Sequence, residues 1–293
     1  MSEPTDIVVV GLRGLAFIAV MQSAGSALFS ACADTRLWES GEKLRRVTLV
    51  AALLAALLVV FQHLLEPSRM TASFSGIWNG SLQLILLQSD AGAARAVRIL
   101  GLTAITIGFW RPGPRRSSLL VVGATLTLSS FLLMGHTADH PQRWLLAILL
   151  VLHLLIASFW FGALLAFLFA ASREPPAVYG GIVHEFSRAA GLLVPVIALA
   201  GLAMAIILLP GLAALSTPYG GLLVAKIVGF ALLMALAAWN KFWLAPALAR
   251  GEQAALGRFR RVVAAEWILI AVMLGVTAVM TGLFGPDHPG QAL

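Results

Sequence analysis

Residues that can ligate a soft metal ion gather in the segment MGHTADH. This segment contains Met134, His136 and His140. Thioether and imidazole groups together suit Cu(I), which prefers soft ligands. His136 and His140 are four residues apart, as two ligands on one helical face would be, but Pro141 biases His140 away from helix. The segment therefore predicts a metal-capturing site, with a solvated polar loop as the alternative.

Another histidine lies inside a long apolar stretch. His153 follows Trp144 by nine residues, which is about 13 Å along a helix. Trp160 lies seven residues further on and shares its helical face. A polar side chain at that depth is costly and usually faces the interior of a helix bundle. Imidazole binds copper, zinc or haem iron; the alternative is a histidine that is hydrogen-bonded to a neighbouring helix.

Three further histidines differ in where they lie. His63 ends an apolar stretch, and His288 lies in the C-terminal tail PDHPG. The orientation derived below puts both on the same side of the membrane as His136, so either could complete a metal site. His184 falls on the opposite side, where a structural or solvated role is expected.

The last apolar stretch carries a stripe of Glu266, Met273 and Met280, each seven residues after the one before. A carboxylate and two thioethers on one face could line a path for Cu(I). Methionine also fills irregular gaps in apolar cores. Packing is the favoured interpretation of this stripe, and a metal path is the alternative.

Four basic residues lie in the outer parts of apolar stretches: Arg13, Arg95, Arg98 and Lys226. They could extend toward the membrane interface, pair with Glu66, Asp90 or Asp139, or bind an anionic group. A path for bare cations would need carboxylates, and the apolar stretches hold few. These residues therefore favour a relay of soft ligands over electrostatic conduction.

The composition places all these residues in a membrane protein. Of 293 residues, 60% are hydrophobic and 11% are charged, whereas soluble domains are about 25% charged. Cys32 is the only cysteine, which excludes an internal disulfide and a Cys-x-x-Cys metal pair. No phosphate-binding G-x-x-x-x-G-K-[ST] motif is found, and no catalytic constellation stands out, so we expect no enzyme.

Eight apolar stretches are long enough to span a bilayer as helices. They cover residues 7–31, 47–66, 91–110, 117–135, 144–172, 187–210, 221–244 and 262–284. The segment 74–88 is also apolar but contains Asn79, Gly80 and Gln83, which indicates an amphipathic or re-entrant segment; if it spans, the count becomes nine. The sequence thus predicts an all-α bundle of about eight transmembrane helices in one domain, residues 1–293.

Lysine and arginine predict the orientation. Fourteen of the 20 basic residues follow the first, third, fifth and seventh stretches, whereas the other connections hold only Arg69 and Arg143. The positive-inside rule then puts both termini on the periplasmic side. The net charge of +7 is therefore a topology signal, and nucleic acid is not an expected partner.

Four segments in order resemble the copper-resistance D (CopD) family of bacterial inner-membrane proteins. They are the Gly-His of MGH, LHLLIASFWFGALL, EFSRAAGLLVPVIALAGL, and the run from STPYGG through WNKFWLAPAL to RRVVAAEW and a terminal proline. The resemblance covers about residues 135–286. Leu150 stands where the family often has an acidic residue, and Asn240-Lys241 replaces a more usual Asn-Arg.

The resemblance implies copper handling at the bacterial cytoplasmic membrane, beside a periplasmic copper-binding partner. The histidines then suggest capture of copper, favoured as Cu(I), at His136, His140, His63 and Met134, followed by inward transfer past His153. A path beyond it could use side chains on three stretches: Trp160, Met273, Met280, Glu266 and Lys226.

Three alternatives stay open. A b-type haem electron carrier needs axial histidines on facing helices, and only His63 and His153 lie within spans, at depths that differ by roughly 8–9 Å. A copper-delivery or assembly factor would bind the metal without transporting it. A purely structural subunit would leave the interior polar residues without a function.

Overall fold

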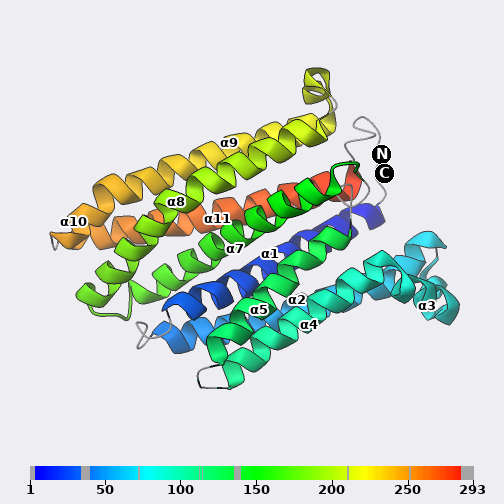
Figure 1. The fold of residues 1–293 in the computed structure, drawn as a ribbon, viewed down its shortest axis with the longest axis horizontal. Coiled ribbons are helices and arrows are strands. Elements are labelled where there is room, and N and C mark those ends of the chain that lie inside the picture. The colour runs from blue at the N-terminus through cyan, green and yellow to red at the C-terminus, as the bar shows by residue number, and fades with distance from the viewer. Residues whose placement is uncertain are drawn as a thin grey trace.

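The structure is a computed structural model that describes residues 4–33, 40–71, 73–111, 113, 115–134, 140–209, 211–250 and 252–284. Eight of its helices are long and apolar enough to cross a membrane, and no strand occurs in the described residues. The helices are α1 (Pro4–Ala33), α2 (Ser40–Met70), α4 (Asp90–Trp110), α5 (Arg116–Ser129), α7 (Arg143–Ala170), α8 (Pro176–Leu208), α9 (Pro218–Trp239) and α11 (Gln253–Leu283). The predicted all-α, multi-span fold is confirmed (Figure 1).

Short helices complete these spans. The 3₁₀-helix η2 (Ser130–Leu133) extends α5, and α9 continues through η4 (Asn240–Leu244) into α10 (Ala245–Ala249). The segment that made the predicted count uncertain forms η1 (Phe74–Trp78) and α3 (Gly80–Gln88). At 1.5 Å per residue, α3 is about 13 Å long and too short to span. The count of eight therefore stands for the described residues.

The first residue of α1 and the last of α11 lie at the same end of the bundle (Figure 1). That end also carries α3 and the 3₁₀-helix η3 (Leu212–Ser216), which connects α8 to α9. We call it the outer end, after the predicted periplasmic side, and the opposite end the inner end. Because eight is an even number, eight successive spans bring the end of the last helix back to the side on which the first helix begins.

Glycine lets helices approach each other closely at two crossings. A Cβ on Gly25 of α1 would collide with the backbone of Ser158 on α7, and a Cβ on Gly162 would collide with the backbone of Gly25. Gly101 of α4 faces Gly123 and Thr127 of α5 in the same way. Small residues favour such contacts in membranes, where dispersion packing rather than the hydrophobic effect holds helices together.

Helix α1 joins two groups of helices along the middle of the bundle. It packs against α2 and α5 on one side and against α7 and α11 on the other. Its buried Gln22 accepts a hydrogen bond of 2.8 Å from the indole of Trp267 on α11 and donates one of 2.7 Å to Ser26. A polar contact of this kind holds α11 in register with α1.

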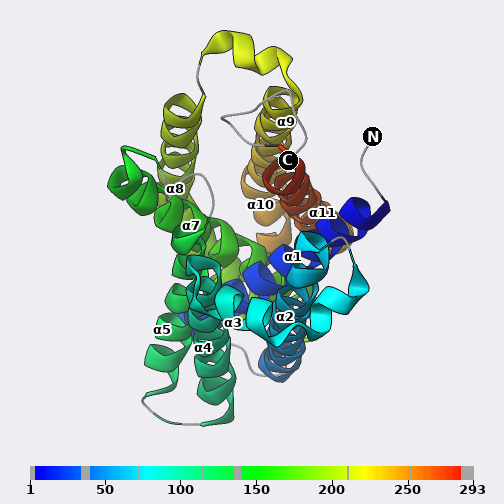
Figure 2. The same cartoon turned by 90° about the vertical axis from the view of Figure 1, so that its right-hand side faces the viewer.

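The C-terminal helices pack less completely. Helix α8 packs against α7, and α9 packs against α11, but α8 and α9 lie apart within the described residues (Figure 2). Large apolar side chains on α8 such as Leu199 (66% exposed) and Ile206 (68% exposed) point away from the protein. Lipid is the natural neighbour of such apolar surface in a membrane protein.

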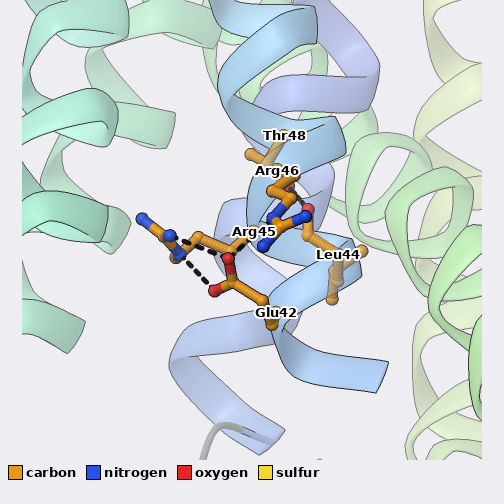
Figure 3. A network of polar contacts seen from close by, with 5 residues as sticks. All are labelled: Glu42, Leu44, Arg45, Arg46 and Thr48. Carbon is orange, nitrogen blue, oxygen red and sulfur yellow. Dashed lines mark hydrogen bonds and ion pairs between the residues drawn. The ribbon is translucent and has the colours of Figure 1, made fainter. Parts of the chain in front are cut away.

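Three helices begin further toward the inner end than predicted. Helix α2 begins at Ser40, α8 at Pro176 and α11 at Gln253, each at least seven residues before the predicted start. Hydropathy stops at the first charged turn, whereas the helix continues through it. In α2 that turn contains Glu42, which accepts hydrogen bonds from Arg45 (2.7 Å) and Arg46 (2.8 Å) (Figure 3).

Candidate functional site

A polar layer lies in the outer half of the C-terminal helices. It consists of His153 on α7, Lys226 on α9 and Met273 on α11. They lie eight to ten residues from the outer ends of their helices, which is about 12–15 Å. A Cβ on Gly201 of α8 would be 3.6 Å from Nδ1 of His153, so that imidazole packs directly on α8. The layer is therefore in contact with all four C-terminal helices, α7, α8, α9 and α11.

The imidazole of His153 has coordination capacity left. Its Nδ1 is buried beside the backbone of Ile197 on α8 and makes no hydrogen bond of ordinary geometry. Lys226 is near enough to repel a positive charge on this ring. The sulfur of Met273 packs against α9, 3.1 Å from where a Cβ on Gly229 would lie. The layer thus contains a nitrogen and a sulfur atom that can ligate a metal ion, together with the Lys226 ammonium, which would repel a bound cation.

A second polar layer lies deeper. Trp160 and Glu266 are each seventeen residues from the outer ends of α7 and α11, which is about 25 Å. Asn240 Nδ2 donates a hydrogen bond of 2.5 Å to Glu266 Oε1, and the Glu266 side chain is almost fully buried. The Trp160 indole faces this carboxyl, but its Nε1 makes no hydrogen bond, nor does Oδ1 of Asn240. No ion pair with Glu266 is found among the described residues.

The backbone at Asn240 departs from the α-helix. Residues 240–244 form a π-helical turn in which the N–H of Ala245 bonds the carbonyl of Asn240. Pro246 follows and has no N–H to give to the carbonyl of Phe242. The hydrogen-bond ladder is thereby displaced by one residue, a distortion that occurs often at functional sites. The π-helical turn is part of what presents Asn240 to Glu266.

The predicted capture site lies only partly within the described residues. His136 lies outside them. Met134 follows η2 and is half-buried. His140 precedes α7, and its Nδ1 accepts a hydrogen bond of 3.1 Å from the Gln142 N–H. His140 is therefore not helical, as Pro141 indicated.

His63 is held by a basic neighbour. Its Nδ1 accepts a hydrogen bond of 2.9 Å from Arg95 Nη1, and Arg95 Nη2 is 3.5 Å from Glu66. Of the alternatives that the sequence left open for Arg95, the structure shows pairing with Glu66. The bond to Arg95 occupies Nδ1 and leaves Nε2 as the remaining ligand atom of His63. Among the described residues, no three His, Cys, Asp or Glu side chains form a metal-binding group.

The two intramembrane histidines contact opposite flanks of the bundle. His63 bonds Arg95 on α4, whereas His153 packs on α8. Helices α4 and α8 lie on opposite sides of α1 and α7 (Figures 1 and 2). One haem between these two rings would need both to turn toward a shared space. The geometry gives no support to that alternative.

The remaining predicted pathway residues are packed side chains. Met280 is almost fully buried near the outer end of α11, and Trp160 is 5% exposed.

Asn240 was not among the predicted site residues, because a polar residue near a helix end is typical of simple capping. Its partnership with Glu266, 26 residues away, depends on how α9 packs against α11. The nearby Pro246 is the sequence signal that could have pointed to it.

Eight membrane-crossing helices with buried polar layers define a multi-pass integral membrane protein. The family described as copper resistance protein D matches residues 180–280, and the family described as copper resistance protein D-like, N-terminal domain matches residues 2–142. Copper resistance protein D of Pseudomonas syringae pv. tomato is 27% identical over 214 residues, which cover 69% of this chain and 68% of that protein. No solved structure matches.

The chain belongs to the copper resistance protein D family and is a multi-pass protein of the bacterial inner membrane. Its general role is copper resistance. The predicted resemblance began only at residue 135, whereas the family matches extend to the N-terminal half. Residues 143–179, which include His153 and Trp160, lie between the two matched ranges.

Proposed function

We propose that the protein binds copper, as Cu(I), at its outer end and moves it across the cytoplasmic membrane. The observation that carries the proposal is the succession of two polar layers in the C-terminal helices, the outer one partly buried and the inner one centred on the buried Trp160 and Glu266. The outer layer contains His153, Lys226 and Met273, and the inner layer contains Trp160, Asn240 and Glu266. Polar side chains inside a membrane are costly and usually mark a functional interior.

Capture begins at the outer end in this proposal. His136, His140 and Met134 lie within seven residues of each other in the sequence, in the stretch that precedes α7. His63 is the fourth candidate ligand and offers only Nε2 to a metal, since Arg95 holds Nδ1. Two or three soft ligands are enough for Cu(I), which favours imidazole and thioether groups. A periplasmic copper-binding protein is the proposed donor.

Transfer past the outer layer uses His153 and Met273. The unpaired Nδ1 of His153 supplies a ligand atom, and the thioether of Met273 supplies a soft one. Lys226 repels a cation at this layer. We propose that this repulsion keeps copper from resting at His153, since conduction needs binding that is weak enough to release the ion.

The inner layer provides a carboxyl group. Glu266 has Asn240 as its hydrogen-bond donor and no ion pair among the described residues. A buried carboxylate without a counter-charge is unfavourable unless a cation or a proton reaches it. We propose that Glu266 receives the cation that leaves His153.

Copper binding to the detergent-purified protein tests the proposal. Wild type is compared with the double variant His136→Ala/His140→Ala, with His153→Ala, and with His184→Ala as a control on exposed α8 surface. We expect stoichiometric Cu(I) binding that weakens in the first two variants and not in the control. No binding above that of an unrelated membrane protein would overturn the proposal.

A delivery factor that binds copper outside but transports none is the second candidate function. The capture residues at the outer end would serve it equally well. Copper uptake into sealed vesicles separates the two, because a delivery factor binds the metal without accumulating it inside. Binding that survives in vesicles that take up no copper would replace transport with delivery.

A further inference from the structure

Three arginines gather in the outer half of the N-terminal helices. Arg13 lies on α1, and Arg95 and Arg98 lie one turn apart on α4. Arg98 is 6% exposed; its Nε donates a hydrogen bond of 2.9 Å to Ser130 Oγ, and its guanidinium lies 4.0 Å from the centroid of the Phe131 ring. The guanidinium groups of Arg13 and Arg95 both lie near enough to repel that of Arg98.

Arg98 differs from its two neighbours in its partners. Arg95 contacts the Glu66 carboxylate at 3.5 Å, and Arg13 donates a hydrogen bond of 2.8 Å to the Thr281 carbonyl. No carboxylate contacts Arg98 in the part of the chain that the structure describes. Its Nε donates to Ser130, whereas its two terminal nitrogens donate to no acceptor among the described residues and are not fully buried.

The guanidinium of Arg98 would gain stability from a bound anion. A buried charge costs several kcal/mol unless it is paired, even after relaxation. The stacked Phe131 offsets only part of that cost, since a cation over an aromatic ring gains about 2 kcal/mol when it is desolvated. Neighbouring guanidinium groups increase the cost further. The terminal donors of Arg98 are therefore available to an anionic acceptor.

We propose that the terminal nitrogens of Arg98, flanked by Arg95 and Arg13, form a binding site for a phosphate-type oxyanion. A guanidinium presents a planar pair of donors that matches two oxygens of a phosphate. Ser130 fixes the orientation of that pair by accepting from Nε. The site touches the proposed copper-capture residue His63 through Arg95, whereas the proposed inward path of copper lies in the C-terminal helices.

Two sources share this chemistry: the phosphate of a membrane lipid head group and free inorganic phosphate. Arg98 lies eight residues inside the outer end of α4, about 12 Å along the helix. A free ion would enter from the outer end, whereas a lipid would insert its head group from the side. Both would bring at least one negative charge to three guanidinium groups.

The experiment measures binding to the full-length protein in a neutral detergent after delipidation. One arm titrates inorganic phosphate calorimetrically, and the other titrates short-chain phosphatidylglycerol with phosphatidylcholine as the weakly competing zwitterion. Each arm uses wild type, Arg98→Gln, Arg98→Lys and Arg45→Gln. Arg45 is the matched control, because its guanidinium is already paired with Glu42 at the inner end (Figure 3).

We expect wild type and Arg45→Gln to bind one of the two anions equally well. Arg98→Gln should weaken that binding about tenfold or more, and Arg98→Lys should recover only part of it, since lysine lacks the paired donors. Phosphate binding alone identifies a free ion, and phosphatidylglycerol binding alone identifies a lipid. Failure of wild type to bind either anion would overturn the proposal, as would equal binding by Arg98→Gln.

A second variant keeps the proposal testable if the Arg98→Gln protein does not fold. Ser130→Ala keeps all three arginines and removes only the group that orients Arg98. It should weaken anion binding severalfold while the protein elutes and melts as wild type does. Unchanged binding in Ser130→Ala, together with an unfolded Arg98→Gln, would overturn the geometry proposed for the site.

Discussion

The N-terminal and C-terminal helices of the bundle differ in how closely they pack and in which polar residues they bury. Gly25 of α1 and Gly162 of α7 lie in backbone contact, as do Gly101 of α4 and Gly123 of α5, and the polar residues of the N-terminal helices include three arginines. Helices α8 and α9 lie apart, and the polar residues of the C-terminal group are a histidine, a lysine and a carboxyl with few partners. The contrast indicates close packing at the α1–α7 and α4–α5 crossings and looser packing between α8 and α9.

The largest expected effect lies at the close crossing of α1 and α7. Gly25→Leu would place a side chain inside the backbone contact between α1 and α7, where Ser158 leaves no space. We expect a loss of about 3 kcal/mol or more, seen as a loss of monodisperse protein and a lower melting temperature. Gly11→Leu on the same helix is the control, because nothing lies within 4 Å of its Cβ. A Gly25→Leu protein that melts like wild type would contradict the close backbone contact between α1 and α7.

A smaller effect is expected at the outer polar layer. His153→Ala removes an imidazole whose Nδ1 has no hydrogen-bond partner, so the fold loses little and the metal path loses a ligand. We expect Cu(I) affinity or uptake to fall about tenfold or more. Titration against a Cu(I) indicator measures it, with His184→Ala as the control. Equal losses in both variants would show that the effect is not specific to this layer.

Replacing Lys226 should strengthen copper binding at the outer polar layer. Lys226→Met removes the ammonium that repels a positive charge at His153. Cu(I) should then bind more tightly at this layer, about fivefold, which corresponds to about 1 kcal/mol of relieved repulsion. Lys43→Met is the control, since that ammonium lies over the Phe169 ring at the inner end. Weaker binding in Lys226→Met would mean that the lysine supports the site instead of opposing it.

The smallest expected effect concerns the π-helical turn. Pro246→Ala restores an N–H that can bond the Phe242 carbonyl, which favours a regular helix from α9 into α10. We expect a stability change within about 1 kcal/mol, and a reduced copper uptake because Asn240 turns away from Glu266. Thermal melting and uptake are measured together. Unchanged uptake in a protein with a regularised helix would separate the turn from the path.

Much of the fold follows from local sequence. Long apolar runs predict the eight spans, and Asn79, Gly80 and Gln83 correctly predict that residues 74–88 do not form another. Helix starts were placed too late because hydropathy ends at charged turns such as that of Glu42, where Arg45 and Arg46 neutralise the acid. Local charge pairing, which hydropathy does not measure, lets those helices continue.

The contacts between helices are harder to predict. Glu266 and Trp160 were chosen as pathway residues from their positions, but Asn240 acquires its role only because α9 packs beside α11. Arg98 was expected either to extend to the interface or to find an acid; instead it is buried against Ser130 and Phe131. These pairings depend on helix rotation, and a single sequence does not determine it.

The central claim is that the C-terminal helices carry a copper path that passes Glu266. Cu(I) uptake into sealed vesicles, by wild type and by Glu266→Gln, tests it most directly. Glutamine keeps an oxygen for Asn240 and removes the charge, so the fold is retained; Glu252→Gln, an exposed acid paired with Arg250, is the control. The account predicts uptake by wild type and control and a loss of about tenfold or more in Glu266→Gln. Equal uptake by all three proteins would contradict it.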